Sequence, residues 1–162
     1  MMTTSREGCL VCATRGGEAS RMVQMEAIHL AKEMGKPLVF LYIIDEDVLK
    51  KVDPPMKTAV YDELMWMGKT LLRIAQKRAG VENLDAQLIV RTGDVKEEIG
   101  RFLKESNAGL LLLGAPRGTT ANVFGDDAIE QFAQAIERNT NINVRIIRPE
   151  DQLQFPLEPA AQ

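Results

Sequence analysis

The sequence of 162 residues has one histidine, two cysteines and few aromatic residues, and it contains no long apolar run. A membrane span needs about 18 consecutive apolar residues, so we expect no membrane insertion. One histidine, His29, argues against a metal site, and without a Gly-x-Ser-x-Gly segment it gives no support to a serine hydrolase triad. The net charge of −3 provides no positive field for DNA or RNA, so nucleic-acid binding is not expected.

The two cysteines, Cys9 and Cys12, lie three positions apart on a predicted strand. Side chains alternate along a strand, so this spacing directs the two thiols to opposite faces of a sheet. A redox pair of the form Cys-x-x-Cys lies at the start of a helix instead. We therefore expect two reduced, buried thiols and a cytoplasmic protein, because unpaired thiols persist in reducing compartments.

Apolar periodicity predicts five strands alternating with four helices. The predicted strands are residues 10–14, 37–44, 86–91, 110–113 and 143–148. The predicted helices are residues 19–34, 57–79, 94–106 and 126–138, with Gly35 and Gly80 expected to end the first two. This alternation predicts one α/β domain, residues 8–149, with a doubly wound parallel sheet, helices on both faces and right-handed crossovers. Residues 150–162 are expected to form a C-terminal tail.

The predicted helices carry apolar faces. In helix 19–34, one face is expected to hold Met22, Met25, Ile28, His29 and Ala31. Helix 57–79 carries an apolar patch of Leu64, Met65, Trp66 and Met67, with Met56 close to it. We interpret that patch as the face that packs on the sheet, with a partner surface as the alternative. Asp94 is expected to cap helix 94–106, where the adjacent Glu97 and Glu98 point in different directions and make a poor acid/base pair.

The most informative segment is residues 110–120, in which four leucines precede a loop with two glycines, an arginine and two threonines. The apolar run is typical of a buried parallel strand. Open α/β sheets bind ligands in loops at the carboxyl ends of such strands. Glycines let the backbone approach a ligand, and backbone N–H groups can hold phosphate oxygens. This segment predicts a nucleotide-type or anion site.

Three segments resemble the universal stress protein family, and the resemblance spans residues 9–149. The first, Leu10-Val-Cys-Ala-Thr-Arg-Gly-Gly-Glu-Ala-Ser20, is similar to the first strand and turn of the family. The second, Arg91-Thr-Gly93-Asp94-Val-Lys-Glu-Glu98-Ile99, is similar to the Gly-Asp-Pro-x-x-x-Ile segment that opens a family helix. The third, Asn107-Ala-Gly-Leu-Leu-Leu-Leu-Gly114, is similar to Ala-Asp-Leu-Ile-Val-x-Gly. The resemblance implies a Rossmann-like sheet in the order 3-2-1-4-5, with ATP bound in many members where strands 1 and 4 end.

The resemblance and the glycine loop together define the candidate cofactor-binding residues. They are Ala13, Thr14, Arg15, Gly16, Ile43, Gly114, Arg117, Gly118, Thr119, Thr120 and Gly125. No catalytic residue or metal ligand is expected. Family members commonly dimerise through the last strand, and Val144, Ile146 and Arg148 lie on an apolar strand that would otherwise leave an open sheet edge. We therefore expect a homodimer.

The sequence departs from the ATP-binding pattern of the family. Arg15 stands where ATP-binding members have an aspartate, so a permanent donor replaces an acceptor. Ala128 stands where a later glycine is expected, and Asp126 and Asp127 place carboxylates where a helix start would attract phosphate. We interpret these aspartates as helix caps. Arg15 either helps Arg117 to hold an anion or fills the vacated site and pairs with an acid such as Asp45 or Asp126.

These observations predict a non-catalytic binding or regulatory module in stress response, with an altered nucleotide or anion crevice that does not bind ATP in the usual pose of the family. The alternative is a nucleotide-binding protein that hydrolyses ATP slowly at the same crevice, because phosphoryl transfer depends mainly on positioning and charge neutralisation. No Gly-Lys-Ser/Thr loop supports that alternative. A third possibility is an interaction domain whose crevice is closed by Arg15.

Overall fold

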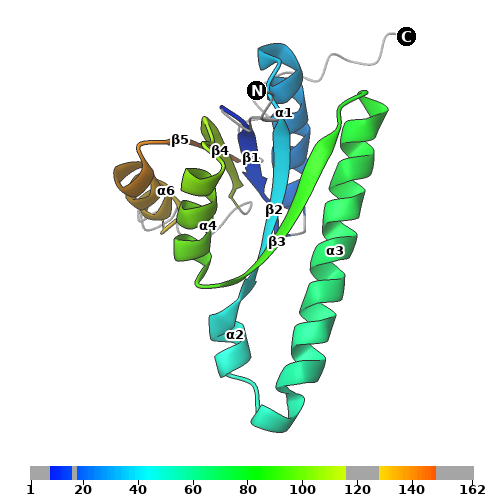
Figure 1. Cartoon of the computed structure of the whole chain (residues 1–162), viewed down its shortest axis with the longest axis vertical. Helices are drawn as coiled ribbons and strands as arrows, with labels where there is room; N and C mark the ends of the chain where they lie inside the picture. Colours follow the sequence, from blue (N-terminus) through cyan, green and yellow to red (C-terminus); the bar gives the residue numbers. More distant parts are fainter. Residues whose placement is uncertain (1–7, 16–17, 116–127, 149–162) are drawn as a thin grey trace, which may run out of the picture.

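The computed structural model describes residues 8–15, 18–115 and 128–148, and its central element is a five-stranded sheet (Figure 1). The strands are β1 (Leu10–Ala13), β2 (Leu38–Asp45), β3 (Ala86–Gly93), β4 (Leu110–Gly114) and β5 (Asn143–Ile147). They lie in the order β3-β2-β1-β4-β5, and every neighbouring pair is parallel. The predicted fold class and strand order are confirmed.

The helices cover the sheet in two layers. They are α1 (Glu18–Met34), α2 (Glu46–Lys50), α3 (Lys57–Val81), α4 (Val95–Glu105) and α6 (Ala128–Thr140), with a 3-10 turn at Pro54–Met56. Figure 1 shows α1 and α3 on one face of the sheet and α4 and α6 on the other. None of the helices in the described ranges combines the length and apolarity that a bilayer crossing demands.

Two apolar cores lie between the sheet and its helices, and the central strand β1 supplies both. Leu10 and Cys12 pack beneath α1 and α3, whereas Cys9 and Val11 pack beneath α4 and α6. All four side chains are fully buried. The expectation of two buried thiols on opposite faces is confirmed, and burial raises the pKa of the Cys12 thiol.

The end of α3 differs from the prediction that Gly80 stops this helix. The helix continues to Val81, and Asn83 takes the left-handed conformation with φ of 59°. The Leu84 N–H then donates to the Ala79 carbonyl at 3.0 Å, which closes the helix with a Schellman-type turn. Glycine near a helix end costs at most about 1 kcal/mol, so burial of the adjacent Ala79 outweighs it.

Two predicted apolar faces also need correction. On α1, Ile28 and Ala31 are buried as expected, but Met25 is 41% exposed, and His29 lies at the surface 3.1 Å from Glu33. On α3, Leu64 and Met65 pack toward the core, whereas Trp66 is 66% exposed and Met67 is 46% exposed. The helical period turns these residues away from the buried stripe of Gly68, Leu72, Ala75 and Ala79.

Candidate functional site

The candidate site lies where β1 and β4 end side by side. Leu10, Val11 and Cys12 pair in register with Leu110, Leu111 and Leu112. The chain leaves β1 for α1 on one face and leaves β4 for α6 on the opposite face (Figure 1). The connections therefore diverge between these two strands, which is the point where open α/β sheets form a ligand crevice.

A cavity of about 400 Å³ opens at this point. Its floor is formed by β1, β2 and β4, and its walls are the first turns of α4 and α6. The lining residues in the described ranges are Ala13, Thr14, Arg15, Leu41, Ile43, Asp45, Val95, Ile99, Leu113, Gly114, Ala115, Ala128, Ile129 and Phe132. The volume falls within the range of small-molecule pockets. Most of these side chains are apolar, and among them Arg15 and Asp45 carry the charges.

The structure brings together part of the predicted set. Ala13, Thr14, Arg15, Ile43 and Gly114 all line the cavity. The other candidates, Gly16, Arg117, Gly118, Thr119, Thr120 and Gly125, lie outside the described residues, as do Asp126 and Asp127. Whether any of them binds a ligand stays a prediction.

Arg15 lines the cavity without filling it. Its side chain is exposed, and its backbone N–H donates to Ser20 Oγ at 3.1 Å. Asp45, one of the two acids considered as partners of Arg15, instead caps α2, where its Oδ1 accepts from the Asp47 N–H at 2.9 Å. Within the described ranges the Arg15 guanidinium makes no ion pair. The pairing of Arg15 with Asp45 is therefore not found, and Asp126, the other acid considered, lies outside the described residues.

A buried hydrogen-bond chain supports the rim of the cavity. Thr14 is 1% exposed, and its Oγ1 accepts from Gln24 Nε2 of α1 at 2.8 Å. Gln24 Oε1 in turn accepts from Arg78 Nη1 of α3 at 2.6 Å. The Thr14 N–H donates to the Leu41 carbonyl at 2.9 Å, which extends the pairing of β1 with β2. The end of β1 is thus held by β2, α1 and α3 together.

Sequence reasoning missed the apolar walls of the site. Val95 and Ile99 come from α4, and Ile129 and Phe132 come from α6. The apolar period of both helices was visible, but it predicted core packing equally well. The position of these residues could have indicated the site. A helix that follows a parallel strand begins at the crevice edge of the sheet, so its first turns lie beside the crevice.

Metal binding and acid/base chemistry depend on where the His, Cys, Asp and Glu side chains lie. Among the described residues, no group of three or more His, Cys, Asp or Glu side chains could hold a metal ion. Asp94 caps α4 through the Glu97 N–H at 3.0 Å, as predicted. Glu97 is exposed, whereas Glu98 is buried and pairs with Arg101 and, at 3.9 Å, with Arg91. The two glutamates therefore act separately, as expected from their positions.

The comparisons with known proteins agree with this geometry. The family model described as the universal stress protein family matches residues 9–148. Universal stress protein UspA from Lactobacillus plantarum is 18% identical, with a TM-score of 0.71 over 88% of this chain and 99% of that chain. A universal stress protein from Archaeoglobus fulgidus in complex with dAMP is 16% identical, with a TM-score of 0.61 over 87% and 97%.

A third similar structure, a universal stress protein in complex with cAMP, is 18% identical, with a TM-score of 0.62 over 88% of this chain and 98% of that chain. No curated protein matches the chain. The likeness to the solved structures shows the fold, and the family model covers nearly all of the described α/β domain. The chain therefore belongs to the universal stress protein family.

Proposed function

We propose that this chain is a non-catalytic binding and regulatory module in stress response, whose crevice accepts a nucleotide or another organic anion in an altered pose. The observation that carries this proposal is the cavity of about 400 Å³ at the end of β1 and β4, with Arg15 at its rim. ATP-binding members of the family have an aspartate, a hydrogen-bond acceptor, at the position of Arg15, whose guanidinium can only donate. The usual ATP pose is therefore not expected.

The lining supports a ligand with an apolar, planar or aliphatic body and an anionic group. Ile43, Ile99 and Phe132 provide apolar contact surface inside the cavity, while the exposed Arg15 provides a cation. A guanidinium can hold phosphate or carboxylate oxygens through two parallel hydrogen bonds. Two similar structures contain cAMP and dAMP, which makes a nucleoside monophosphate a suitable first ligand to test.

We also propose a cytoplasmic homodimer formed through β5. This strand is at the edge of the sheet, and Val144 and Ile146 are half-buried there. Pairing with a second copy would satisfy the backbone groups of that edge. The two buried thiols fit a reducing compartment.

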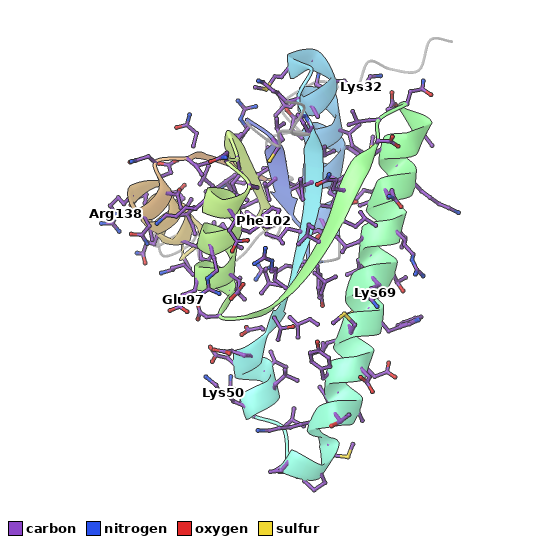
Figure 2. All side chains as sticks on the ribbon, in the orientation of Figure 1. Lys32, Lys50, Lys69, Glu97, Phe102 and Arg138 are labelled. Atoms are coloured by element: carbon purple, nitrogen blue, oxygen red, sulfur yellow. The ribbon has the colours of Figure 1, made fainter. Side chains whose placement is uncertain are left out.

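The test is calorimetric titration of the full chain with AMP, ATP, cAMP and inorganic phosphate, with and without magnesium. We expect weak or no heat with ATP, and binding of the smaller anions that Arg15→Asp abolishes. We expect the same variant to gain ATP binding, because it restores the acceptor of the family. Arg138→Asp is the matched control, since Arg138 lies near the opposite end of α6, far from the cavity (Figure 2).

Two outcomes would contradict the proposal. Micromolar ATP binding by the native chain that Arg15→Asp leaves unchanged would show that Arg15 does not alter the site. Magnesium-dependent turnover of ATP, lost in Arg15→Asp, would favour the alternative of slow hydrolysis.

A further inference from the structure

The buried polar side chains of the described core gather at the end of β1. They are Thr14, Ser20, Gln24, Glu98 and Ser106, each at most 8% exposed. The first three meet at one step of the chain, Thr14–Arg15, which borders the cavity. A buried polar group costs free energy unless it finds a hydrogen-bond partner. Their concentration at this step points to a role other than packing.

Two side chains of α1 hold this step from one side. Ser20 Oγ accepts from the Arg15 N–H at 3.1 Å, and Gln24 Nε2 donates to Thr14 Oγ1 at 2.8 Å. Ser20 and Gln24 are four residues apart, which places them on the same face of the helix. The strand β1 ends at Ala13, so these bonds fix the direction in which the Arg15 side chain leaves the sheet.

Arg78 of α3 sets the orientation of the Gln24 amide. Its Nη1 donates to Gln24 Oε1 at 2.6 Å, and a guanidinium has no acceptor. The amide oxygen must therefore face Arg78, which turns the amide nitrogen toward Thr14. Rotation of the amide by half a turn would set two donors against each other. Arg78 forms no ion pair with the residues that the structure describes, and its bond to Gln24 is charge-assisted.

Gln24 and Arg78 do not line the cavity, whereas Thr14 and Arg15 do. We infer that Gln24 is a positioning residue, which acts through Thr14 to hold Arg15 at the cavity rim in the orientation that binds an anion. Arg78, on the other helix of this face, holds Gln24 in place (Figure 1). This role rests on the proposed function, because it serves the anion site of the crevice. A site that is ordered before the ligand arrives binds more tightly than one that is ordered on binding.

The test is calorimetric titration of the full chain with AMP and with inorganic phosphate. Gln24→Met keeps the approximate size and the neutral charge of the side chain but removes both of its hydrogen bonds. We expect this variant to raise the dissociation constant about threefold to tenfold, as partial loss of the binding-competent conformation does.

Ser106→Ala is the matched control for loss of a buried polar group. Ser106 is 3% exposed, and its hydroxyl donates to the Phe102 carbonyl at 2.7 Å. It caps the end of α4 opposite to the turn that lines the cavity. The variant should therefore lose stability and keep the native dissociation constant for both probes.

Two Arg78 variants provide a conservative comparison. Arg78→Lys retains a charged donor for Gln24 Oε1, whereas Arg78→Met removes it. We expect Arg78→Met to weaken binding of AMP and phosphate in the same direction as Gln24→Met, and Arg78→Lys to recover most of the native affinity. Equal affinity of the two variants would overturn the role assigned to Arg78.

A double-mutant cycle tests whether Gln24 acts through Thr14. Thr14→Val removes the hydroxyl and keeps the shape of the side chain. Gln24→Met should then add no further loss of affinity in the Thr14→Val background. An additional loss of the same size would overturn the inference, because Gln24 would then affect the site by another route.

Amide hydrogen exchange gives a readout that needs no ligand. We expect Gln24→Met to accelerate exchange of the Arg15 N–H about fivefold, the effect of one ordinary hydrogen bond, and Ser106→Ala to leave it unchanged. Native exchange in Gln24→Met overturns the inference, as does native affinity of that variant. If the native chain binds neither probe, the proposed function fails, and the exchange rates still decide whether Gln24 positions Arg15.

Discussion

The two faces of the sheet are built from the same strands, but the described helices cover them differently. On one face, α1 with 17 residues and α3 with 25 residues cover a continuous core. On the other, α4 with 11 residues and α6 with 13 leave the cavity of about 400 Å³ between their first turns. The strands alone do not create this cavity, because its walls depend on where the helices begin.

The largest expected effect comes from truncating one phenylalanine on each face, which compares how tightly the two faces are packed. Phe40 is fully buried under α1 and α3, so Phe40→Ala should cost about 3–5 kcal/mol of unfolding free energy. Phe132 is half-buried and already borders the cavity, so Phe132→Ala should cost only about 1–2 kcal/mol. Urea denaturation measures both. Equal losses would mean that the α4/α6 face is packed as tightly in solution as the other one.

A second, smaller effect tests how closely α3 approaches the sheet. A Cβ added at Gly68 would lie 2.5 Å from a Tyr42 ring carbon, so Gly68→Ala should destabilise the protein by about 1–3 kcal/mol. Gly80 lies in the same helix with no atom within 4 Å of such a Cβ. Gly80→Ala should therefore stabilise by up to about 1 kcal/mol. Thermal unfolding of the pair settles the sign, and a neutral Gly68→Ala would contradict the close contact.

The smallest effect concerns a surface ion pair on the α4/α6 face. Arg91 lies 5.3 Å above the Phe102 ring and 2.5 Å from Glu105, and it holds the pKa of the Glu105 carboxyl below its ordinary value of 4.5. Figure 2 shows Phe102 between α4 and the sheet. A group with a depressed folded pKa stabilises the protein above its unfolded pKa and loses that contribution as the pH falls through the folded pKa.

The unfolding free energies of the native chain and Glu105→Gln should therefore differ by a constant amount at neutral pH and converge below about pH 4.5. Added salt should reduce the difference, because the pair is exposed. A difference that grows toward acid pH would reverse the sign and rule out this account.

Sequence patterns predicted the strands of the sheet well, because a buried strand can be recognised from its own consecutive residues. Four consecutive leucines at 110–113 indicate a buried strand without reference to any partner. The carboxyl ends of strands follow directly, which is why Thr14, Arg15 and Gly114 were placed at the cavity. The resemblance to the family supplied the order of the strands.

The features that sequence reasoning missed depend on tertiary packing. Nothing local to Asp45 distinguishes an α2 cap from a partner of Arg15. In the patch of residues 64–67, Leu64 and Met65 pack on the core while Trp66 and Met67 are exposed. One helical turn has side chains in all directions, so the position of the sheet decides which of them are buried. Likewise, the sequence around Gly80 predicts a helix end there, because the burial of the neighbouring Ala79 depends on tertiary packing.

The opposite placement of Cys9 and Cys12 on β1 has a kinetic consequence. Each thiol is 0% exposed, so a thiol reagent reaches it only when the helix layer above it opens. Cys9 becomes accessible when α4 and α6 separate from the sheet, and Cys12 when α1 and α3 do. Different labelling rates would mean that the α4/α6 layer opens independently of the α1/α3 layer. Equal rates would mean that both layers open in a single cooperative event.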